Sequence, residues 1–132
     1  MPFTLRPQLD PRLRVGLRAE VSPNWQGGRP VSMQTIDLSA SGAAIRSPIC
    51  LPLKTQLSIA LHLPAAAGQA ARTVSCEAVV VNTEEIGHAR SEWRVGAYFL
   101  NLKELDRESL RRFIFLVMDA SSQRRESQAA QG

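Results

Sequence analysis

Residues 37–42 read Asp-Leu-Ser-Ala-Ser-Gly and are followed by the apolar run Ala43-Ala44-Ile45. The segment joins the end of a predicted strand to a sharp corner that carries a carboxylate, hydroxyls and a glycine. Gly42 permits a positive φ or the close approach of another backbone segment. Asp37 and Ser39 can contact a ligand, or they can close the turn through Asx-type hydrogen bonds. These residue types alone favour the turn, so a ligand hypothesis depends on what surrounds them.

Runs of alternating hydrophobicity flank this corner on both sides. In residues 15–22 and 56–63, apolar side chains occupy every second position, which is typical of strands with one buried face. In residues 31–38, the same period places Asp37 on the face of Met33. Turn signals rich in Gly and Pro separate the runs, and about six short strands indicate a sandwich or a closed barrel. The strands are predicted at residues 15–22, 31–38, 43–46, 56–63, 72–82 and 93–100.

The period changes to that of a helix near residue 106. Asp106 is a suitable N-cap, and we predict a helix over residues 106–120 with charged side chains opposite its apolar face. Phe115 and Met118 make this helix more apolar than one docking face requires, which indicates either a wide core contact or a partner surface. The face that should pack on the strands consists of Leu110, Phe113, Ile114 and Val117.

The length of 132 residues allows one domain with short tails. Residues 1–13 contain three prolines and no periodicity, so we predict a flexible leader that carries Arg and Pro. The barrel and its helix should occupy residues 14–120. The polar residues 121–132 should form a disordered tail.

The basic residues are mostly arginines. The formal net charge is only +4, but the sequence pI is about 9.8, and 14 of the 16 basic residues are Arg. Guanidinium groups present planar, bidentate donors that suit phosphate and can stack on bases. Arg72, Arg90 and Arg94 flank predicted strands, where a solvated surface position is the simpler explanation. Charge alone therefore does not identify the partner.

Cysteine usage and hydropathy both indicate a cytoplasmic protein. Cys50 and Cys76 lack the CxxC spacing and sit beside apolar residues, so we predict buried or half-buried free thiols in a reducing compartment. The N-terminal segment has no apolar signal core. No run approaches the roughly 18 apolar residues needed to cross a bilayer.

The sequence offers no catalytic constellation. His62 lies in an alternating apolar strand and His88 in a polar loop, without the clustered His or Cys residues that a zinc site needs. No GxSxG elbow, GxGxxG turn or phosphate-binding P-loop is present. We therefore predict a binding protein that is not an enzyme and holds no metal or other cofactor.

Three features together resemble the PilZ domain family. Asp37, Ser39 and Gly42 match the DxSxxG motif of that family. An arginine cluster lies upstream, Arg12-Leu-Arg14-Val-Gly-Leu-Arg18. The segment Val95-Gly-Ala-Tyr-Phe99 is similar to the closing GxxF strand. The resemblance spans about residues 10–120, and the order of its motifs is more specific than DxSxxG alone.

The resemblance implies a six-stranded antiparallel β-barrel with a C-terminal helix that binds cyclic di-GMP in bacterial signal transduction. In the family, leader arginines clamp phosphates and stack on guanine, while the Asp and Ser contact guanine edges. A dianion with flat purines requires such forked donors and carboxylate acceptors. The implied ligand-binding residues are Arg12, Arg14, Arg18, Asp37, Ser39 and Gly42.

Two registers of the arginine motif remain open. Arg14 and Arg18 form a literal RxxxR. Alternatively, Arg14 is the second motif arginine, because a Val-led strand follows it at the spacing that is usual before the Asp. The first position is then Asp10, and Arg12 could substitute from two residues away.

The expected function is that of a cyclic di-GMP receptor that changes its surface when the leader wraps the ligand, and then acts on an unidentified protein effector. The alternative is a PilZ-like adaptor that has lost strong nucleotide binding and works through its helix. A single-stranded nucleic-acid binder ranks well behind, because such barrels use several strand aromatics and this chain has few. We therefore expect no DNA or RNA partner.

Overall fold

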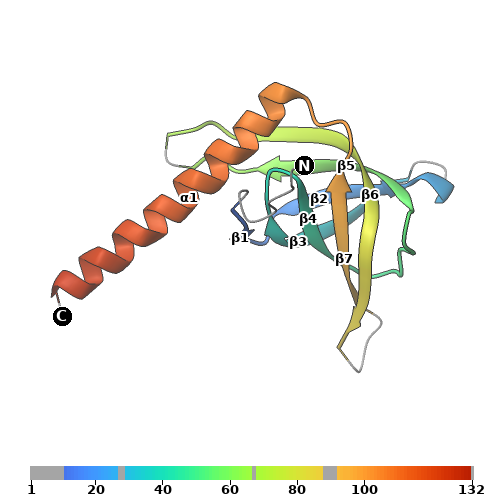
Figure 1. Ribbon diagram of the computed structural model, residues 1–132, viewed down its shortest axis with the longest axis horizontal. Helices are drawn as coiled ribbons and strands as arrows, with labels where there is room; N and C mark the ends of the chain where they lie inside the picture. Colours follow the sequence, from blue (N-terminus) through green and yellow to red (C-terminus); the bar gives the residue numbers. More distant parts are fainter. Residues whose placement is uncertain (1–10, 27–28, 67, 88–91, 132) are drawn as a thin grey trace, which may run out of the picture.

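The computed structural model describes residues 11–26, 29–66, 68–87 and 92–131, and the side chains of this set except Gln26 and residues 121–131. Strands form the largest part of it, and one long helix ends it (Figure 1). The elements are β1 (Leu13–Arg14), β2 (Arg18–Pro23), a 3₁₀ turn (Asn24–Gln26), β3 (Val31–Leu38), β4 (Gly42–Ser47), β5 (Gln56–Leu63), β6 (Arg72–Ile86), β7 (Glu92–Phe99) and α1 (Glu104–Gln131).

The strands close into a barrel. The hydrogen-bonded order is β3-β2-β5-β6-β7-β4, and β4 pairs back with β3, so the ring has no free edge. All of these pairs are antiparallel. The two-residue strand β1 pairs with the end of β3, at Asp37 and Leu38, on the edge whose other part pairs with β2. The predicted six-stranded antiparallel barrel with a C-terminal helix is confirmed.

A β-bulge divides β3 into two parts. The register against β4 shifts between Thr35 and Asp37, which makes Ile36 the extra residue. Thr35 before the bulge and Leu38 after it are both buried, whereas Asp37 lies on the outer surface. The prediction that Asp37 shares a face with Met33 is therefore wrong. A strict alternation would have put this carboxylate in the apolar interior, and the bulge avoids that cost.

The predicted first strand is interrupted. Its residues 15–17 leave the sheet, and regular pairing of β2 begins only at Arg18. The buried Thr35 side chain holds this interruption, because its Oγ1 donates to the Val15 carbonyl at 2.5 Å and accepts from the Leu17 amide at 2.8 Å. Residues 13 and 14 then run alongside the end of β3, where Arg14 lies opposite Asp37.

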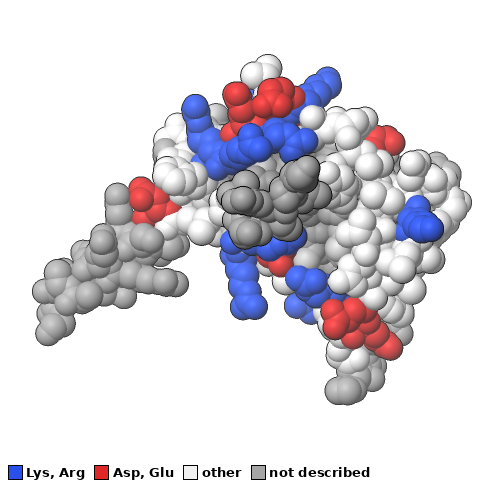
Figure 2. Space-filling model, viewed as in Figure 1, with Lys and Arg blue, Asp and Glu red and all other residues white. Residues whose placement is uncertain are grey.

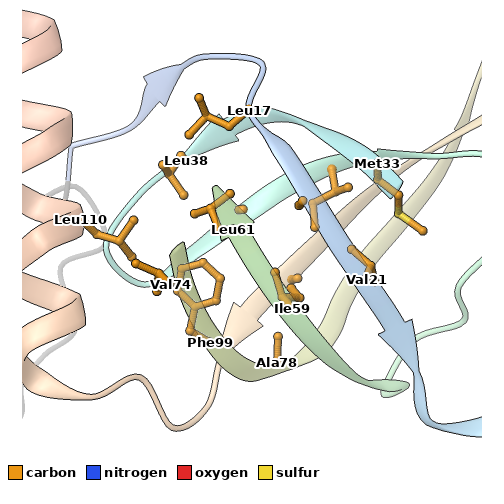
Figure 3. Packing of buried hydrophobic residues seen from close by; sticks show 14 of the residues in the cluster. Leu17, Val21, Met33, Leu38, Ile59, Leu61, Val74, Ala78, Phe99 and Leu110 are labelled. Atoms are coloured by element: carbon orange, nitrogen blue, oxygen red, sulfur yellow. The ribbon is translucent and has the colours of Figure 1, made fainter. Parts of the chain in front are cut away.

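The core follows the predicted alternation elsewhere. Inward side chains from all six barrel strands form one apolar cluster, into which the helix inserts Leu110, Phe113 and Ile114 (Figure 3). These three are at most 3% exposed, and Val117 packs against the same cluster. The predicted docking face of the helix is confirmed, and this face covers one end of the barrel (Figure 1).

The helix is longer than predicted at both ends. It begins at Glu104, so Asp106 is not its cap; Asp106 instead pairs with Arg72 of β6 at 2.7 Å. It continues to Gln131, well past the predicted end at Ala120, and its C-terminal half extends away from the barrel (Figure 1). Residues 121–131 contain Gln, Glu, Arg and Ala and no Gly or Pro, a composition that supports a helix more than the predicted disordered tail.

The remaining differences from the predicted elements are smaller. The strand β6 runs to Ile86, four residues beyond its predicted end at 82. Cys76 is a half-buried free thiol as predicted, but Cys50 is exposed because it lies in the loop after β4. Residues 1–10, most of the predicted leader, lie outside the described residues. None of the described helices has the length and apolar character of a membrane span.

Candidate ligand-binding site

A cavity of about 220 Å³ opens on the outer surface of the barrel, where β4 lies between β3 and β7. The corner formed by residues 41–44 provides one wall and residues 94–98 of β7 provide another. A bulge in β6, where the register shifts between Val80 and Asn82, supplies part of the rim. The lining residues are Arg12, Ser41, Gly42, Ala43, Ala44, Val81, Asn82, Arg94, Gly96, Ala97 and Tyr98.

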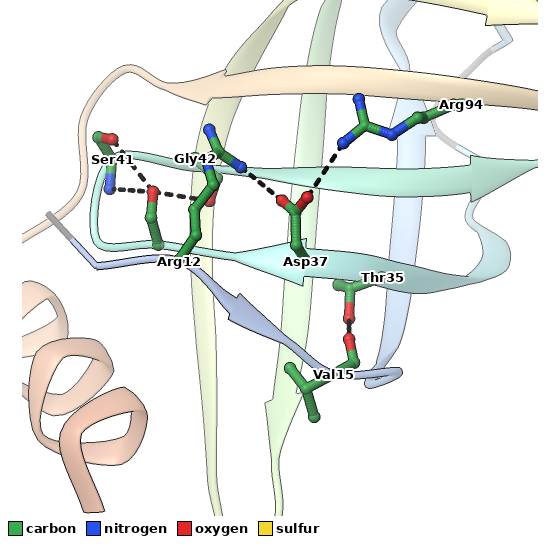
Figure 4. Close-up of polar contacts among 8 residues, drawn as sticks. Arg12, Val15, Thr35, Asp37, Ser41, Gly42 and Arg94 are labelled. Atoms are coloured by element: carbon green, nitrogen blue, oxygen red, sulfur yellow. Dashed lines mark hydrogen bonds and ion pairs between the residues drawn. The ribbon is translucent and has the colours of Figure 1, made fainter. Parts of the chain in front are cut away.

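Two arginines hold the Asp37 carboxylate beside this cavity (Figure 4). The Arg12 guanidinium pairs with Oδ1 from the segment before β1. The Arg94 guanidinium pairs with Oδ2 from β7, at 3.0 Å. The Asp37 side chain is only 13% exposed, so these pairs lie at the edge of the barrel wall rather than in open solvent. Charge-assisted hydrogen bonds of this kind are stronger than neutral ones.

The structure separates the other two arginines of the predicted site. Arg14 is the cross-strand partner of Asp37, and directly opposed residues project from the same face of a sheet. Arg18 instead pairs with Glu20 at 2.9 Å on β2, and it does not line the cavity. Of the predicted arginines, Arg12 and Arg14 therefore lie beside Asp37, and Arg18 does not. Asp10 lies outside the described residues.

The corner itself is a hydrogen-bonded turn. The buried Ser39 Oγ accepts from the Ser41 amide at 3.2 Å and lies 3.3 Å from the Gly42 carbonyl, which also accepts from the Ser39 amide. Ser41, whose Oγ lies 3.2 Å from Ser39 Oγ, lines the cavity. Ser39 thus shapes the turn, and of the two serines Ser41 is the one that lines the cavity.

Gly42 is required for a close approach of backbones rather than for a positive φ. A Cβ at this position would lie 2.3 Å from the Ala97 carbonyl oxygen on β7. No side chain can replace it without moving one of the two strands. This position explains why the corner ends in glycine.

Sequence reasoning missed Arg94, Tyr98, Asn82 and Ser41. The prediction that Arg94 is solvated surface is wrong, because its guanidinium binds Asp37 and the residue lines the cavity. A signal was available, because Val95, Ala97 and Phe99 are the inward residues of β7. The intervening residues must then face outward, next to β4, which begins at Gly42 of the motif.

The site combines a surplus of cationic groups with flat apolar surface. Arg12, Arg14 and Arg94 face a single carboxylate, Asp37. Tyr98 is 52% exposed and offers a ring face at the rim. On the face seen in Figure 2, basic side chains gather over the barrel and the start of α1, with acidic side chains among them. Such a surface suits an anion with an aromatic group. Within the described part of the chain, no cluster of His, Cys, Asp and Glu could hold a metal ion.

The sequence matches the family model of the PilZ domain over residues 8–116. The chain belongs to the PilZ domain family. This match covers the barrel, the corner and the buried turns of α1. No protein of curated function matches the sequence significantly.

Solved structures with a similar fold include one that is itself a PilZ domain. The inhibitor of motility MotI/DgrA from Bacillus subtilis has a TM-score of 0.68 at 14% identity, over 84% of this chain and 50% of that one. MrkH of K. pneumonia in its apo state has a TM-score of 0.64 at 16% identity, over 92% and 53%. The PilZ domain of YcgR from Escherichia coli with c-di-GMP has a TM-score of 0.59 at 17% identity, over 86% and 94%. The present chain thus spans about half the length of MotI/DgrA and MrkH.

In this PilZ domain the site touches the helix directly. The Arg107 guanidinium, on the first turns of α1, donates to the Ala40 carbonyl at 2.9 Å. Ala40 lies in the middle of the corner, between Ser39 and Ser41. A change in the conformation of the corner would therefore alter a contact made by the first turns of α1.

Proposed function

We propose that this PilZ domain is a receptor for cyclic di-GMP. The observation that carries the proposal is the Asp37 carboxylate held between two guanidiniums at the edge of a cavity on a PilZ barrel. A carboxylate can accept the N–H groups of a guanine edge, and guanidinium forks can bind the phosphates. The YcgR PilZ domain, which shares this fold, was solved with c-di-GMP.

The size of the cavity supports a ligand that lies partly on the surface. Its volume of about 220 Å³ is below the roughly 300–1,000 Å³ typical of pockets that enclose a drug-sized molecule. We infer that one base enters the cavity beside Ser41 and Tyr98. The phosphates would then meet the arginines of residues 12–14, and the remaining atoms would stay outside.

Isothermal titration with cyclic di-GMP tests this function. The wild-type chain should bind, and Asp37→Ala should weaken binding about ten- to a hundredfold, since charge-assisted contacts contribute about 1.5–3 kcal/mol. Arg14→Ala should have a similar effect. Arg18→Ala is the matched control, because Arg18 pairs with Glu20 away from the cavity, and its affinity should change less than twofold. Absence of binding heat from a folded wild-type chain would refute the receptor function.

Signalling would pass through α1. The Arg107–Ala40 contact supports this route because it joins the corner to the helix that carries exposed apolar side chains. Ligand binding at the corner should alter this contact and so bias the position of α1 between two states. Hydrogen exchange of the α1 amides, with and without ligand, measures the effect. Unchanged exchange at saturating ligand would contradict it. The protein effector and the cytoplasmic location stay predictions.

A second candidate is an adaptor that acts through α1 without strong nucleotide binding. Three large apolar side chains on the helix support it, because Leu105, Phe115 and Met118 are 71%, 68% and 38% exposed. Arg12 also occupies the Asp37 carboxylate in the ligand-free chain, so a ligand must displace it. The wild-type titration separates the two candidates.

A further inference from the structure

Of the described residues that line the cavity, Arg94 is the one basic residue that comes from the interior of a barrel strand. We propose that it is a positioning residue of the ligand site: it holds the Asp37 carboxylate towards the cavity and compensates its charge when Arg12 turns to the ligand. This inference rests on the proposed function.

The backbone of Arg94 is fixed on both sides. It lies opposite Arg46 of β4 and opposite Glu84 of β6, within the two long ladders that join β7 to its neighbours. Its side chain is 34% exposed, and it reaches across β4 to Asp37 Oδ2 on β3. The pair therefore joins β3 and β7, the two strands that flank β4.

Arg12 is held much less firmly. It precedes β1, which has only two residues, and its side chain is 57% exposed. Residues 11 and 12 have no strand pairing of their own. Of the two cations on Asp37, Arg12 is the one that can move to a phosphate at small cost in backbone contacts.

The charge balance of the site explains why a second cation is needed. An approaching phosphate would compete with Asp37 for Arg12, and it would also repel the carboxylate. If Arg94 stays hydrogen-bonded to one lone pair of Oδ2, the negative charge of the carboxylate stays compensated. The carboxylate has about four acceptor positions, so it retains lone pairs for base N–H groups. Without Arg94, the ligand phosphate and Asp37 would share one guanidinium.

The test compares Arg94→Gln with Arg46→Gln by titration calorimetry. Arg46 is the neighbour of Arg94 across β4 and β7, and it forms a surface pair with Glu92 at 3.2 Å without lining the cavity. Arg94→Gln should weaken cyclic di-GMP binding about ten- to thirtyfold, as expected for a lost charge-assisted contact. Arg46→Gln should stay within twofold. Arg94→Lys, which keeps the charge, should recover most of the affinity and guards against a folding defect.

Two readouts separate positioning from direct ligand contact. In the Asp37→Asn background, Arg94→Gln should add less than a twofold loss, because its effect passes through Asp37. Cyclic di-IMP, whose bases lack the guanine amino group, should lose less affinity than cyclic di-GMP upon Arg94→Gln. An equal loss for both ligands, or an undiminished loss in the Asp37→Asn background, would overturn the inference and leave the receptor function intact. A wild-type chain that binds no cyclic di-GMP would overturn both.

Discussion

Replacing Gly42 by alanine tests the most restrictive contact of the site. The added Cβ would lie 2.3 Å from the Ala97 carbonyl oxygen, whereas real Cβ contacts essentially never fall below 3.0 Å. The two backbones must therefore separate by at least 0.7 Å, the difference between these two distances. The obstacle is a main-chain atom in the β4–β7 ladder, so no side-chain rotation can relieve it.

The expected destabilisation follows from this displacement. Overpacking of a well-packed region costs roughly 1–3 kcal/mol. Moving the strands also strains the hydrogen bond from the Phe99 amide to the Ser41 carbonyl, now 3.0 Å, which contributes about 1 kcal/mol. The free energy of unfolding of Gly42→Ala should thus fall by roughly 2–4 kcal/mol, and its melting temperature by roughly 7–14 °C.

Thermal and urea unfolding without ligand measure the effect. Gly16→Ala is the matched control, because a Cβ there would meet nothing closer than the Thr35 carbonyl at 3.7 Å. Its stability should stay within about 0.5 kcal/mol of the wild type, or rise slightly. A single hydrogen bond contributes about 1 kcal/mol. If the free energy of unfolding of Gly42→Ala lies within about this amount of the wild-type value, the close-approach argument is refuted.

Three further predictions concern the core, the leader and a thiol. Phe113→Ala should cost about 3–5 kcal/mol in urea unfolding because the ring is 3% exposed, whereas the exposed Arg112→Ala should stay within about 0.5 kcal/mol; equal midpoints would show that the helix face is misassigned. Thr35→Val should cost about 1–3 kcal/mol and weaken ligand binding, because two buried backbone groups lose their partner; unchanged binding would show that residues 11–14 need no such anchor. Burial raises the pKa of the Cys76 thiol from 9.0 to about 11, helped by the charges of nearby acids. Since the folded state disfavours the thiolate, this thiol's contribution to stability should be present below pH 9 and decrease from there to pH 11. Cys76→Ala should flatten that decrease, and Cys76 should alkylate more slowly than the exposed Cys50, because it is less accessible and only the thiolate reacts.

The barrel and the helix face could be predicted because their signals are local. Alternation within a strand reports which side chains are inward without knowledge of the neighbouring strand. The helix spacing similarly identified Leu110, Phe113 and Ile114, all of which are buried. The corner at residues 37–42 could be located because Gly and Ser end a strand in a recognisable way.

The geometry of the site could not be predicted because it depends on pairing across strands. The Asp37 carboxylate meets Arg12 from the start of the chain and Arg94 from the last strand. The β1–β3 pairing brings Arg12 to Asp37, and only the closure of β4 onto both β3 and β7 brings Arg94 there. The start of α1 was missed for a similar reason, since Asp106 binds Arg72 of another element instead of capping its own helix.

The bulge at Ile36 gives β3 two independent alternations, one on each side of it. Before the bulge, Met33 and Thr35 face the core. After it, Asp37 faces the ligand surface, although only one residue separates it from the buried Thr35. If Ile36 were kept in a regular ladder without the bulge, Asp37 would turn into the apolar interior and Leu38 would turn out. Deletion of Ile36 would instead leave Thr35 and Leu38 inward and Asp37 outward. Loss of the bulge with Ile36 retained would therefore disrupt folding and binding together, whereas point changes at position 37 can alter ligand chemistry without disturbing the barrel interior. This arrangement lets the recognition chemistry of the strand diversify on a barrel whose interior packing stays constant.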